Sequence, residues 1–520
     1  MCTSDLRNWH IVSTLESEFV SRIHMVMVYG ENGKNALIVT RDKMVYALGA
    51  NTKGCLGTGN KDATLHPKKI EVLCTKDVKT FACSYNHVLA LTKGGEVYSW
   101  GYNFYSQVRK GLALTVVTPT LVNIPIPKRI IDIACGFNHS IALTEFGELY
   151  FWGVHKYKHK FTKFTILAGK KIVYISCGGA FTIVVIENGE VYGWGINFSG
   201  QLGVGDTNNR TTPCQLNSLK NIVIVKVACG YMHTLALTDE GDLYVWGENS
   251  CGQLGTGNQR NWYEPVVIEH QMGRVLDIAA SYCHDISIAI GKEGRLYVWG
   301  YCHGQTVMTP IVTPFSDVHN AIASYATSNI MHKPLILNGN EELGILKCLK
   351  TAFDDHLTSD LKIQVENQII HVHKAILKIR SFYFKMMFQH VWSEKNQSVI
   401  QHDEYSYKVY KAFLNYLYTD VIGLPWEQTV ELFILANDYC EDSLKKKCIR
   451  ILMQGITISN VTYLYTIAVK YKEEELEEFC IKFAVNHFTV VALTENFAKL
   501  DQNMMKTLII KTSEAGGFKM

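Results

Sequence analysis

The chain has 520 residues, too many for a single hydrophobic core, so roughly two to four domains are expected. With 47% hydrophobic and 19% charged residues, its composition is that of a globular chain and excludes a disordered one. The net charge of +3, from 51 basic and 48 acidic residues, gives no electrostatic basis for direct nucleic-acid binding.

The sequence carries no sign of membrane insertion or of a zinc site. No stretch reaches about 18 uninterrupted apolar residues, and residues 1–29 lack the basic-then-apolar layout of a signal peptide. The 15 cysteines include no Cys-x-x-Cys pair, and scattered thiols fit a reducing compartment. We therefore expect a soluble intracellular protein, cytoplasmic, nuclear or both, with no membrane partner and no cofactor.

A Tyr-x-Trp-Gly motif returns at a nearly constant interval through the first part of the chain. Its Trp-Gly pairs are Trp100-Gly101, Trp152-Gly153, Trp194-Gly195, Trp246-Gly247 and Trp299-Gly300, preceded by a weaker Leu48-Gly49. Successive glycines lie about 52 residues apart, with one shorter interval of about 42. This period indicates one supersecondary unit copied several times, each copy burying its apolar face against its neighbours.

Each copy has the pattern of four short strands. Residues 131–144 and 225–238 both contain two apolar runs joined by a Gly-x-x-His turn, and each is followed by a Gly-x-Leu-Tyr strand. A fourth run follows an Asn-x-x-Gly-Gln-Leu-Gly turn, as in residues 212–216 and 265–268. Short runs rich in Val, Ile and Tyr are typical of strands and exclude a helical solenoid. Four antiparallel strands per copy, arranged radially, predict a β-propeller.

This repeat resembles that of the regulator-of-chromosome-condensation (RCC) family, whose members are seven-bladed propellers. The resemblance covers about residues 24–340, after an N-terminal segment of residues 1–23. A WD-type propeller is less favoured, because it would show Trp-Asp and a shorter period. Six copies are clear. A degenerate seventh is expected at residues 317–338, where 321–325 resemble the strand and turn but the Trp-Gly is missing. In the third copy the basic stretch 155–163 replaces the glycine-rich turn.

Cysteine and histidine each recur at a fixed position of the repeat. The recurring residues are Cys83, Cys135, Cys177 and Cys229, with Ala280 in a later copy, and His87, His139, His233 and His284. Alanine in place of cysteine indicates a small buried position. A ring of histidines would have to converge within about 2 Å of one ion to bind a metal, so we interpret them as hydrogen-bonded turn residues.

Two glycine-rich segments, residues 200–205 and 252–257, resemble phosphate-binding loops. Both follow a Trp-Gly strand, recur with the repeat and lack the Lys-Ser/Thr of a P-loop. We therefore expect their glycines to supply positive φ in a turn, and no nucleotide to bind there.

The second part of the chain mixes strands and helices. A strand is predicted at 359–365 with a hairpin partner at 369–372, and helices at 373–380, 381–388, 407–418, 427–437 and 441–452. Three motifs resemble those of the BTB/POZ domain: Asp360-Leu-Lys-Ile, Val372-His373-Lys374 through Ser381 and Phe384, and Phe413-Leu-Asn-Tyr-Leu-Tyr418-Thr419. We assign residues 341–455 to this α/β domain. Residues 456–520 resemble the short helical extension of cullin adaptors.

The combination is similar to the family that carries both RCC-type repeats and a BTB/POZ domain, and no catalytic constellation is visible. The resemblance implies a non-enzymatic adaptor that binds protein partners. Its BTB domain would form a homo- or heterodimer and recruit a cullin-3 ubiquitin ligase, while its propeller would hold a client protein.

Candidate partner-binding residues follow from the same resemblance. The cullin face is assigned to Phe384, Met387, Tyr410, Phe413 and Tyr418, and the client face to Tyr102, Phe104, Tyr105, Phe198, Trp262 and Tyr263. Cullin-binding BTB domains often carry an apolar-x-Glu motif in the third helix, where this chain has Ala412 at the glutamate position. Loss of such a polar contact weakens an interface by about 1–3 kcal/mol.

A second function class is nucleotide exchange on a small GTPase through the propeller, which is the activity of the founding family. It resembles a reaction at the propeller rim that uses acidic residues of the Gly-x-x-His turns. The matching positions are Tyr85-Asn86, Phe137-Asn138, Gly179-Ala180, Tyr231-Met232 and Tyr282-Cys283. None is acidic, although Asp285 follows His284, so exchange is the alternative to the adaptor.

Overall fold

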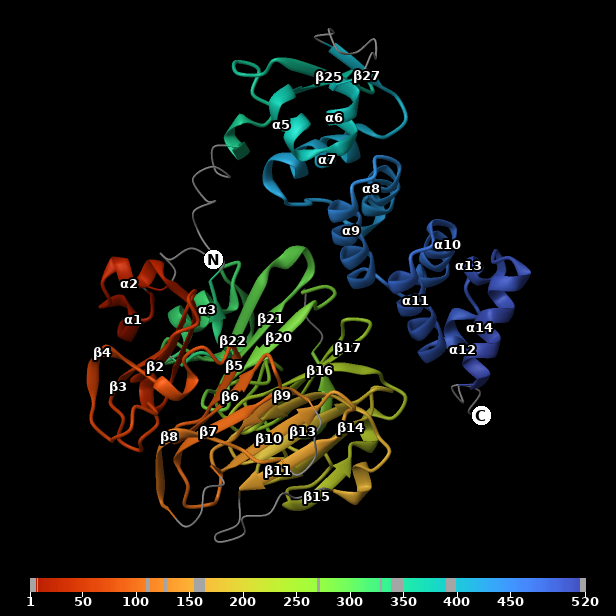
Figure 1. Ribbon diagram of the computed structural model, residues 1–520. Helices are drawn as coiled ribbons and strands as arrows, with labels where there is room; N and C mark the ends of the chain where they lie inside the picture. Colours follow the sequence, from red (N-terminus) through yellow and green to blue (C-terminus); the bar gives the residue numbers. More distant parts are fainter. Residues whose placement is uncertain are drawn as a thin grey trace. The chain divides into compact units, whose positions relative to one another are not determined.

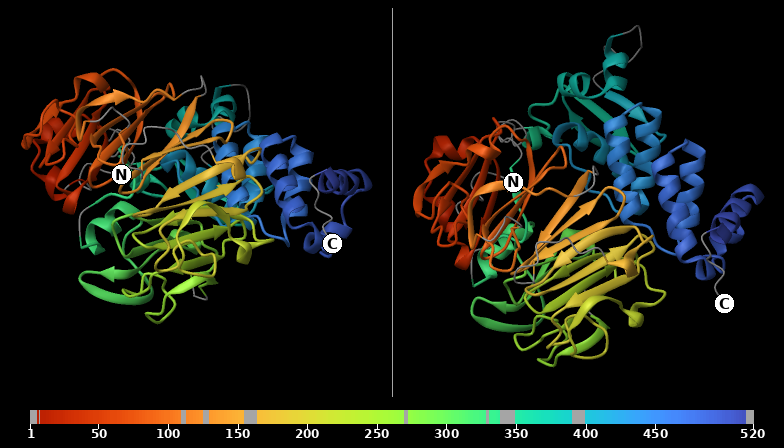
Figure 2. Two further views of the ribbon diagram at one scale, coloured as in Figure 1. Left: turned by 90° about the horizontal axis from the view of Figure 1, so that it is seen from below. Right: turned by 60° about the horizontal axis from the view of Figure 1, so that its bottom comes forward.

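The chain divides into two separately packed units, Met1–Gly339 and Asn340–Met520. The computed structural model describes residues 6, 8–108, 113–124, 129–153, 164–268, 272–327, 330–337, 349–389 and 399–514. In Figures 1 and 2 the red-to-green part of the chain is built mainly of strands, and the blue part is helical. Each unit has its own hydrophobic core.

The described residues of the first unit form six antiparallel sheets, which we number as blades 1 to 6 (Figure 1). Blade 1 contains β1 (Ile23–Tyr29), β2 (Asn35–Thr40), β3 (Val45–Gly49) and β4 (Thr64–Lys69), and blade 2 contains β5 (Val78–Cys83), β6 (His87–Thr92), β7 (Val97–Tyr102) and β8 (Thr115–Leu121). Blade 3 contains β9 (Ile130–Cys135), β10 (His139–Thr144) and β11 (Leu149–Gly153), and blade 4 contains β12 (Ile172–Cys177), β13 (Phe181–Ile186), β14 (Val191–Gly195) and β15 (Arg210–Gln215). Blade 5 contains β16 (Ile224–Cys229), β17 (His233–Thr238), β18 (Leu243–Gly247) and β19 (Trp262–Val267), and blade 6 contains β20 (Asp277–Ala280), β21 (Ile286–Ile290), β22 (Leu296–Cys302) and β23 (Gln305–Val312).

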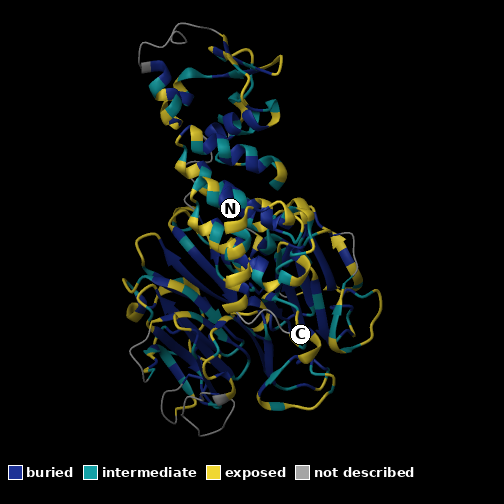
Figure 3. Cartoon of the chain, turned by 90° about the vertical axis from the view of Figure 1, so that its right-hand side faces the viewer, coloured by how far each residue is buried: buried dark blue, intermediate teal, exposed yellow. Residues whose placement is uncertain are grey.

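The first strands of the blades surround a central cavity of about 330 Å³, so the predicted propeller is confirmed. β5, β9, β12, β16 and β20 contact one another in that order. The recurring cysteines lie at the ends of four of these strands with buried side chains, as expected for a small core position. Figure 3 shows that the strands are mostly buried and that exposed residues gather in the loops.

The predicted seventh copy is not a strand-turn repeat. Residues 321–325, expected to form its strand and turn, lie in the helix α3 (Val318–Tyr325). Asp317 caps this helix by accepting hydrogen bonds from the backbone N–H groups of His319 and Asn320, at 2.9 and 3.1 Å. His319 and Ile322, three residues apart, are both buried, which is the spacing of one face of a helix. A capping aspartate and this spacing explain why the segment is a helix.

The first unit is closed by pairing the end of its chain with its first strand. β24 (Leu335–Ile336) pairs antiparallel with β1, and outside this short strand the N–H of Leu337 donates to the His24 carbonyl at 2.7 Å. The N-terminal helices α1 (His10–Ser13) and α2 (Ser17–Ser21) precede β1, and Trp9 is buried in the same core as Leu335. The described part of the predicted N-terminal segment (residues 1–23), from residue 8 onward, therefore packs on the propeller.

The second unit has a three-stranded sheet followed by helices. β25 (Leu361–Val365) lies between β26 (Gln368–Val372), its antiparallel hairpin partner, and β27 (Val399–His402), which is parallel to it. The helices are α5 (Lys374–Arg380), α6 (Phe382–Gln389), α7 (Tyr407–Thr419), α8 (Trp426–Asp438), α9 (Asp442–Gln454), α10 (Val461–Tyr471), α11 (Glu474–Asn486), α12 (Phe488–Val491), α13 (Glu495–Ala498) and α14 (Gln502–Glu514). The predicted α/β domain with a helical extension is confirmed. No helix among the described residues is long and apolar enough to span a membrane.

Closure through β24 yields a stability prediction. Leu335 is 3% exposed, whereas its neighbour Ile336 is 49% exposed. We expect Leu335→Ala to lower the free energy of unfolding of the propeller by about 2–4 kcal/mol, because it leaves a cavity in the core that joins the two ends of the unit. Urea denaturation followed by tryptophan fluorescence measures this change. Ile336→Ala is the matched control, and equal effects of the two variants would contradict the role of β24.

Candidate functional site

Hydrogen bonds between neighbouring blades begin at the recurring histidines. The Nε2 atom of His87 lies 2.9 Å from Ser140 Oγ in the next blade, and His233 Nε2 lies 2.9 Å from Ser287 Oγ. His139 Nε2 makes the same contact to Thr182 Oγ1 at 3.0 Å. These three histidines are therefore hydrogen-bonded turn residues, as predicted.

In blades 2 and 5, a glutamine in the turn after the third strand provides the second part of this contact through its backbone carbonyl. Gln107 O accepts hydrogen bonds from Ser140 Oγ at 2.9 Å and from Trp152 Nε1 at 2.8 Å. Gln253 O accepts from Ser287 Oγ at 2.7 Å and from Trp299 Nε1 at 3.0 Å. We call this group of histidine, hydroxyl, glutamine carbonyl and tryptophan the interblade latch.

Proton counting shows which ring nitrogen of the latch histidines is protonated. The hydroxyl of Ser140 or Ser287 has one proton, which it donates to the glutamine carbonyl. The histidine Nε2 must therefore carry the proton of its own bond to that hydroxyl. Burial lowers the pKa of both His87 and His233 to about 3, which keeps them neutral at pH 7.

Glycine is required in these turns for close packing. Gly203 has φ of +71°, and a Cβ there would lie 2.8 Å from Trp246 Nε1 of the next blade. Trp246 Nε1 donates to Gln201 O at 2.9 Å, so the turn has to approach the tryptophan this closely. The expectation that these glycines serve a turn is confirmed.

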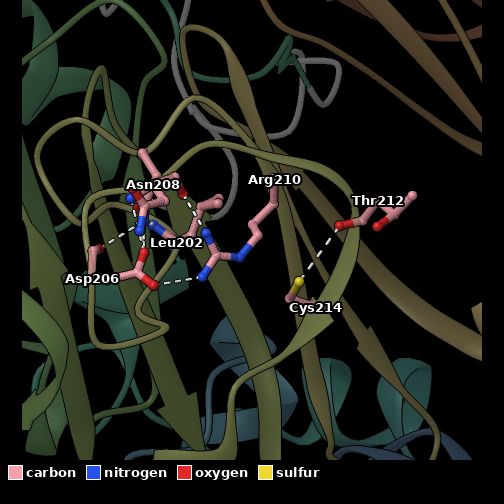
Figure 4. Close-up of polar contacts among 7 residues, drawn as sticks. Leu202, Asp206, Asn208, Arg210, Thr212 and Cys214 are labelled. Atoms are coloured by element: carbon pink, nitrogen blue, oxygen red, sulfur yellow. Dashed lines mark hydrogen bonds and ion pairs between the residues drawn. The ribbon is translucent and has the colours of Figure 1, made fainter.

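Polar contacts within the turn of blade 4 hold it in shape (Figure 4). The buried Asn197 amide donates to Asp206 O at 2.7 Å, and its Oδ1 accepts from the N–H of Leu202 at 2.9 Å. Asp206 forms an ion pair with Arg210 at 2.6 Å, and Arg210 also donates to Asn208 O at 2.8 Å. The face of the propeller that carries these turns is therefore built from fixed loops. The corresponding stretch of blade 3, residues 155–163, lies outside the described residues.

The six aromatic residues assigned to a client face fall into two separate groups. Tyr102, Phe104 and Tyr105 contact one another in blade 2, with centroid distances of 6.2 and 5.0 Å, and Lys53 lies over the Tyr102 ring at 5.1 Å. The second group is at blades 4 and 5, where Gly200, two residues after the exposed Phe198, packs on Tyr263. There Arg260 lies over the half-buried Trp262 at 5.4 Å. Whether either group binds a client stays a prediction.

A third aromatic group, which the sequence interpretation missed, lies where the Gly-x-x-His turns meet. Tyr85, Phe137, Tyr231 and Tyr282 occupy the same position in the turns of blades 2, 3, 5 and 6. Their ring centroids lie 5.2 Å (Tyr85–Phe137), 5.8 Å (Tyr85–Tyr282), 5.7 Å (Phe137–Tyr231) and 5.8 Å (Phe137–Tyr282) apart. We call these four residues the aromatic cap. Their shared position in the repeat was the signal in the sequence.

Backbone bonds and a glycine hold the aromatic cap together. Blade 4 has Gly179 at the cap position, and a Cβ there would lie 3.1 Å from Tyr231 and 3.3 Å from Phe137. The N–H of Phe137 donates to Gly179 O at 2.8 Å, and the N–H of Gly179 donates to Tyr231 O at 3.2 Å. The missing side chain in blade 4 therefore lets the rings of blades 3 and 5 meet.

Acidic side chains surround the cap. Glu31 lies in the turn between β1 and β2 of blade 1, and Asp285 follows the cap turn of blade 6. Burial raises the pKa of Asp285 to about 6, with a further contribution from Glu248, and Gln253 Nε2 donates to its carboxylate at 3.3 Å. The pKa of Tyr85 is raised to about 12, mainly by burial. Smaller electrostatic contributions to this shift come from Cys283, Tyr231, Glu31 and Asp285.

The residues assigned to a cullin face lie in the core of the second unit. Phe384, Met387, Tyr410, Phe413 and Tyr418 are all buried in one cluster. Side chains at such positions pack the domain and are covered by other residues, so a partner has no direct access to them. This corrects their assignment as surface contacts, because the apolar spacing of α6 and α7 marks their inward faces.

The three BTB-like motifs meet through hydrogen bonds. Asp360 Oδ1 accepts from the N–H of Lys374 at 2.7 Å at the start of α5. The hydroxyl of Tyr418 accepts from the N–H of His373 at 2.7 Å and lies 3.0 Å from its Nδ1. The motif residues therefore tie the sheet to α5 and α7.

Half-buried Ala412 in α7 occupies the position expected for the glutamate of an apolar-x-Glu motif. Its neighbour Lys411 forms an ion pair with Asp354 at 2.6 Å and donates to Tyr407 Oη at 3.2 Å. The charged group next to Ala412 on this turn of α7 is therefore already paired with a carboxylate of the same unit.

Comparison with family models assigns three consecutive segments. Residues 14–314 match the RCC1-like domain model, 349–456 the BTB/POZ domain model, and 461–513 the BACK (BTB And C-terminal Kelch) model.

Curated relatives match over the propeller. The ultraviolet-B receptor UVR8 of Arabidopsis thaliana is 33% identical over 267 residues, which are 51% of this chain and 51% of the receptor. The E3 ubiquitin-protein ligase HERC2 of Homo sapiens is 33% identical over 292 residues, 55% of this chain and 5% of that protein. The chain therefore spans about half the length of the first relative and a small part of the second.

Solved structures also match over the propeller. Prp20p of Saccharomyces cerevisiae has 22% identity and a TM-score of 0.47, covering 56% of this chain and 77% of that one. Human WBSCR16 has 21% identity and a TM-score of 0.47, covering 52% of this chain and 78% of that one.

The neutral histidines of the latch predict an acid-sensitive propeller. Their folded pKa values, about 3 for His87 and His233, lie below the ordinary value of 6.5. The unfolded chain therefore binds more protons below pH 6.5, and stability that is fully present above that pH is lost as pH falls toward 3. Each histidine contributes about 1.4 kcal/mol per pH unit in this window. Urea denaturation between pH 7 and pH 4 measures the slope.

The His233→Gln variant is the control for this slope. We expect it to be less stable than the parent at pH 7 and to lose less stability on acidification, because one titrating group is gone. Identical slopes for parent and variant would contradict the assignment of a neutral His233 to the latch.

Proposed function

Because the chain belongs to the RCC1-like domain family and continues into BTB/POZ and BACK domains, we propose that it is a non-enzymatic adaptor. In this proposal the propeller holds a client protein and the second unit links it to other proteins. The observation that supports this proposal most is that the chain folds as two separately packed units. One presents fixed loops and an aromatic cap on one face of a closed ring, and the other is a BTB/POZ domain, which is a protein-interaction module.

An exposed apolar pair supports association of the BTB domain. Ile379 at the end of α5 is 81% exposed and Phe382 at the start of α6 is 60% exposed. Large apolar side chains that are neighbours on a surface mark interaction sites. BTB domains associate through their first helices, so we assign this pair to a two-fold interface in which the same patch meets its copy. Two linked client sites per dimer raise avidity without a new contact.

A cullin-3 link is the second element of the proposal. The helices that BTB domains present to cullin-3 correspond to α6, α7 and α9. The apolar residues first assigned to that face are buried. In this proposal cullin-3 therefore contacts exposed and half-buried residues of these helices, such as Tyr383 and Ala412. Alanine at the glutamate position makes this interaction weak, by about 1–3 kcal/mol relative to a domain with the full motif.

The dimer is tested by light scattering of the full chain at micromolar concentration. We expect a mass of twice the 58.8 kDa chain. The double variant Ile379→Asp/Phe382→Asp is expected to be a monomer, because two buried carboxylates would face their copies across the interface. Leu493→Asp, which changes an exposed leucine in another part of the unit, is the control. A monomeric parent chain would contradict self-association.

The cullin-3 link is tested by titrating the full chain with the amino-terminal domain of cullin-3. We expect weak binding by the parent, at tens of micromolar, and about tenfold tighter binding by Ala412→Glu, because the missing polar contact is restored. Lys408→Glu is the matched control, since it adds a carboxylate at an exposed position of the same helix. Absence of saturable binding by both the parent and Ala412→Glu would overturn the ligase proposal and leave a dimeric scaffold.

A further inference from the structure

The aromatic cap has an acidic border without a counter-ion. Asp285 and Glu248 lie close enough for each to disfavour the other's charge, and Glu31 borders the cap from blade 1. Among the described residues, no lysine, arginine or histidine forms an ion pair with any of these three carboxylates. Other acids of the propeller do form ion pairs, as Asp206 does with Arg210 and Asp77 does with Lys43.

Keeping Asp285 in this place costs stability. The carboxylate is largely withdrawn from water and faces Glu248, the thiols of Cys251 and Cys283, and the phenol of Tyr85. Within the described part of the chain, only Gln253 Nε2, at 3.3 Å, offers it a side-chain hydrogen bond. A half-buried acid beside a second acid is a common feature of functional sites, where an arriving cation relieves the repulsion.

The rings of the cap suit the same kind of ligand. Tyr231 is 36% exposed, whereas Tyr282 is buried and packs at a steep angle against Tyr85 and Phe137, so the cap offers a ring to a ligand at Tyr231. An aromatic face attracts a lysine or arginine side chain, and a nearby carboxylate adds a charge-assisted hydrogen bond. An anion would be repelled here, and a purely apolar ligand would leave the carboxylates unpaired.

We propose that the aromatic cap and its acidic border, Glu31, Glu248 and Asp285, bind a basic segment of the client through a lysine or arginine side chain. This inference rests on the proposed adaptor function and names the chemistry of the client. The occupant is a lysine- or arginine-bearing peptide segment. The cation lies over the exposed face of Tyr231 and pairs with Asp285, and the remaining basic residues meet Glu248 and Glu31.

The site has a characteristic dependence on pH. In the free protein Asp285 has a pKa of about 6, so it is charged at pH 7.5 and mostly protonated at pH 5. Binding of a cation favours the charged form, and affinity therefore falls as pH falls through 6. The thiols of Cys251 and Cys283 and the phenol of Tyr85, with pKa values raised by burial, stay neutral over this range.

The test is a fluorescence-anisotropy titration of the full chain with fluorescein-labelled hexalysine at pH 7.5, with hexaglutamate as the charge control. We expect saturable binding of hexalysine only. Tyr231→Ala and Asp285→Asn are each expected to weaken it by about fivefold or more, and Tyr231→Phe to leave it within about twofold of the parent. At pH 5 the parent loses affinity to the level of Asp285→Asn, whose own affinity changes less.

Two further variants separate the cap from general charge and aromatic effects. Phe146→Ala removes an exposed ring and Glu145→Gln removes an exposed acid, both in the turn between β10 and β11, at the opposite end of the strands from the cap. Both are expected to bind hexalysine as the parent does. Equal weakening by Glu145→Gln and Asp285→Asn, or no effect of Tyr231→Ala, would overturn the proposal.

The outcome is independent of the BTB domain. A chain that fails to dimerise or to bind cullin-3 still contains the cap, so those failures leave this titration unchanged. Absence of hexalysine binding, with the cullin-3 titration as predicted, would overturn the cap proposal alone. Asp285→Asn removes a half-buried charge while keeping an acceptor for Gln253, so thermal melting at pH 7.5 is expected to show a folded variant at least as stable as the parent.

Discussion

A backbone carbonyl in the turn after the third strand of a blade holds that blade to the next one. At Gln107 and Gln253 this carbonyl accepts a serine hydroxyl and a tryptophan N–H from the next blade, and that hydroxyl in turn accepts from a histidine. At Cys55 it accepts the N–H of Trp100. These groups are buried, so each lost partner leaves an unsatisfied polar atom. The bonds fix the turns at one face of the ring, and the aromatic cap depends on that fixed geometry. A binding surface made of four separate turns exists only if the blades keep their relative positions.

The sequence was sufficient to predict what repeats locally. The Trp-Gly strands and the Gly-x-x-His turns recur in the chain as they do in the blades, so strand order and the small cysteine position followed directly. It was misleading at residues 321–325, where alanine and isoleucine fit either a strand or the inner face of a helix, and the preceding Asp317 decides for the helix. Phe413 was placed on a surface because apolar spacing marks one face of α7 without saying what covers it.

Contacts between blades were beyond sequence reasoning for a physical reason. Ser140 lies 53 residues from His87, and nothing local to either residue reveals the hydrogen bond between them. The aromatic cap was missed in the same way, because each of its rings looks like an ordinary turn residue until four turns meet. The electrostatics of the cap likewise depend on residues from several blades. Asp285 has an ordinary sequence context, and only burial beside Glu248 gives it a raised pKa. The function we propose depends on these collective features, with a rigid ring that selects a basic client and a BTB domain that links it to other proteins.

Hydrogen–deuterium exchange of the full chain with and without hexalysine is the most direct test of a rigid propeller that binds its client at the aromatic cap. It locates the bound peptide and also reports how rigid the blade strands are. The account predicts slow exchange throughout the blade strands in both states, and added protection confined to the turns that carry Tyr85, Phe137, Tyr231 and Tyr282 together with the segment at Asp285. Protection spread over the strands, or found only in the second unit, would contradict the claim that a rigid propeller presents its client site at the aromatic cap.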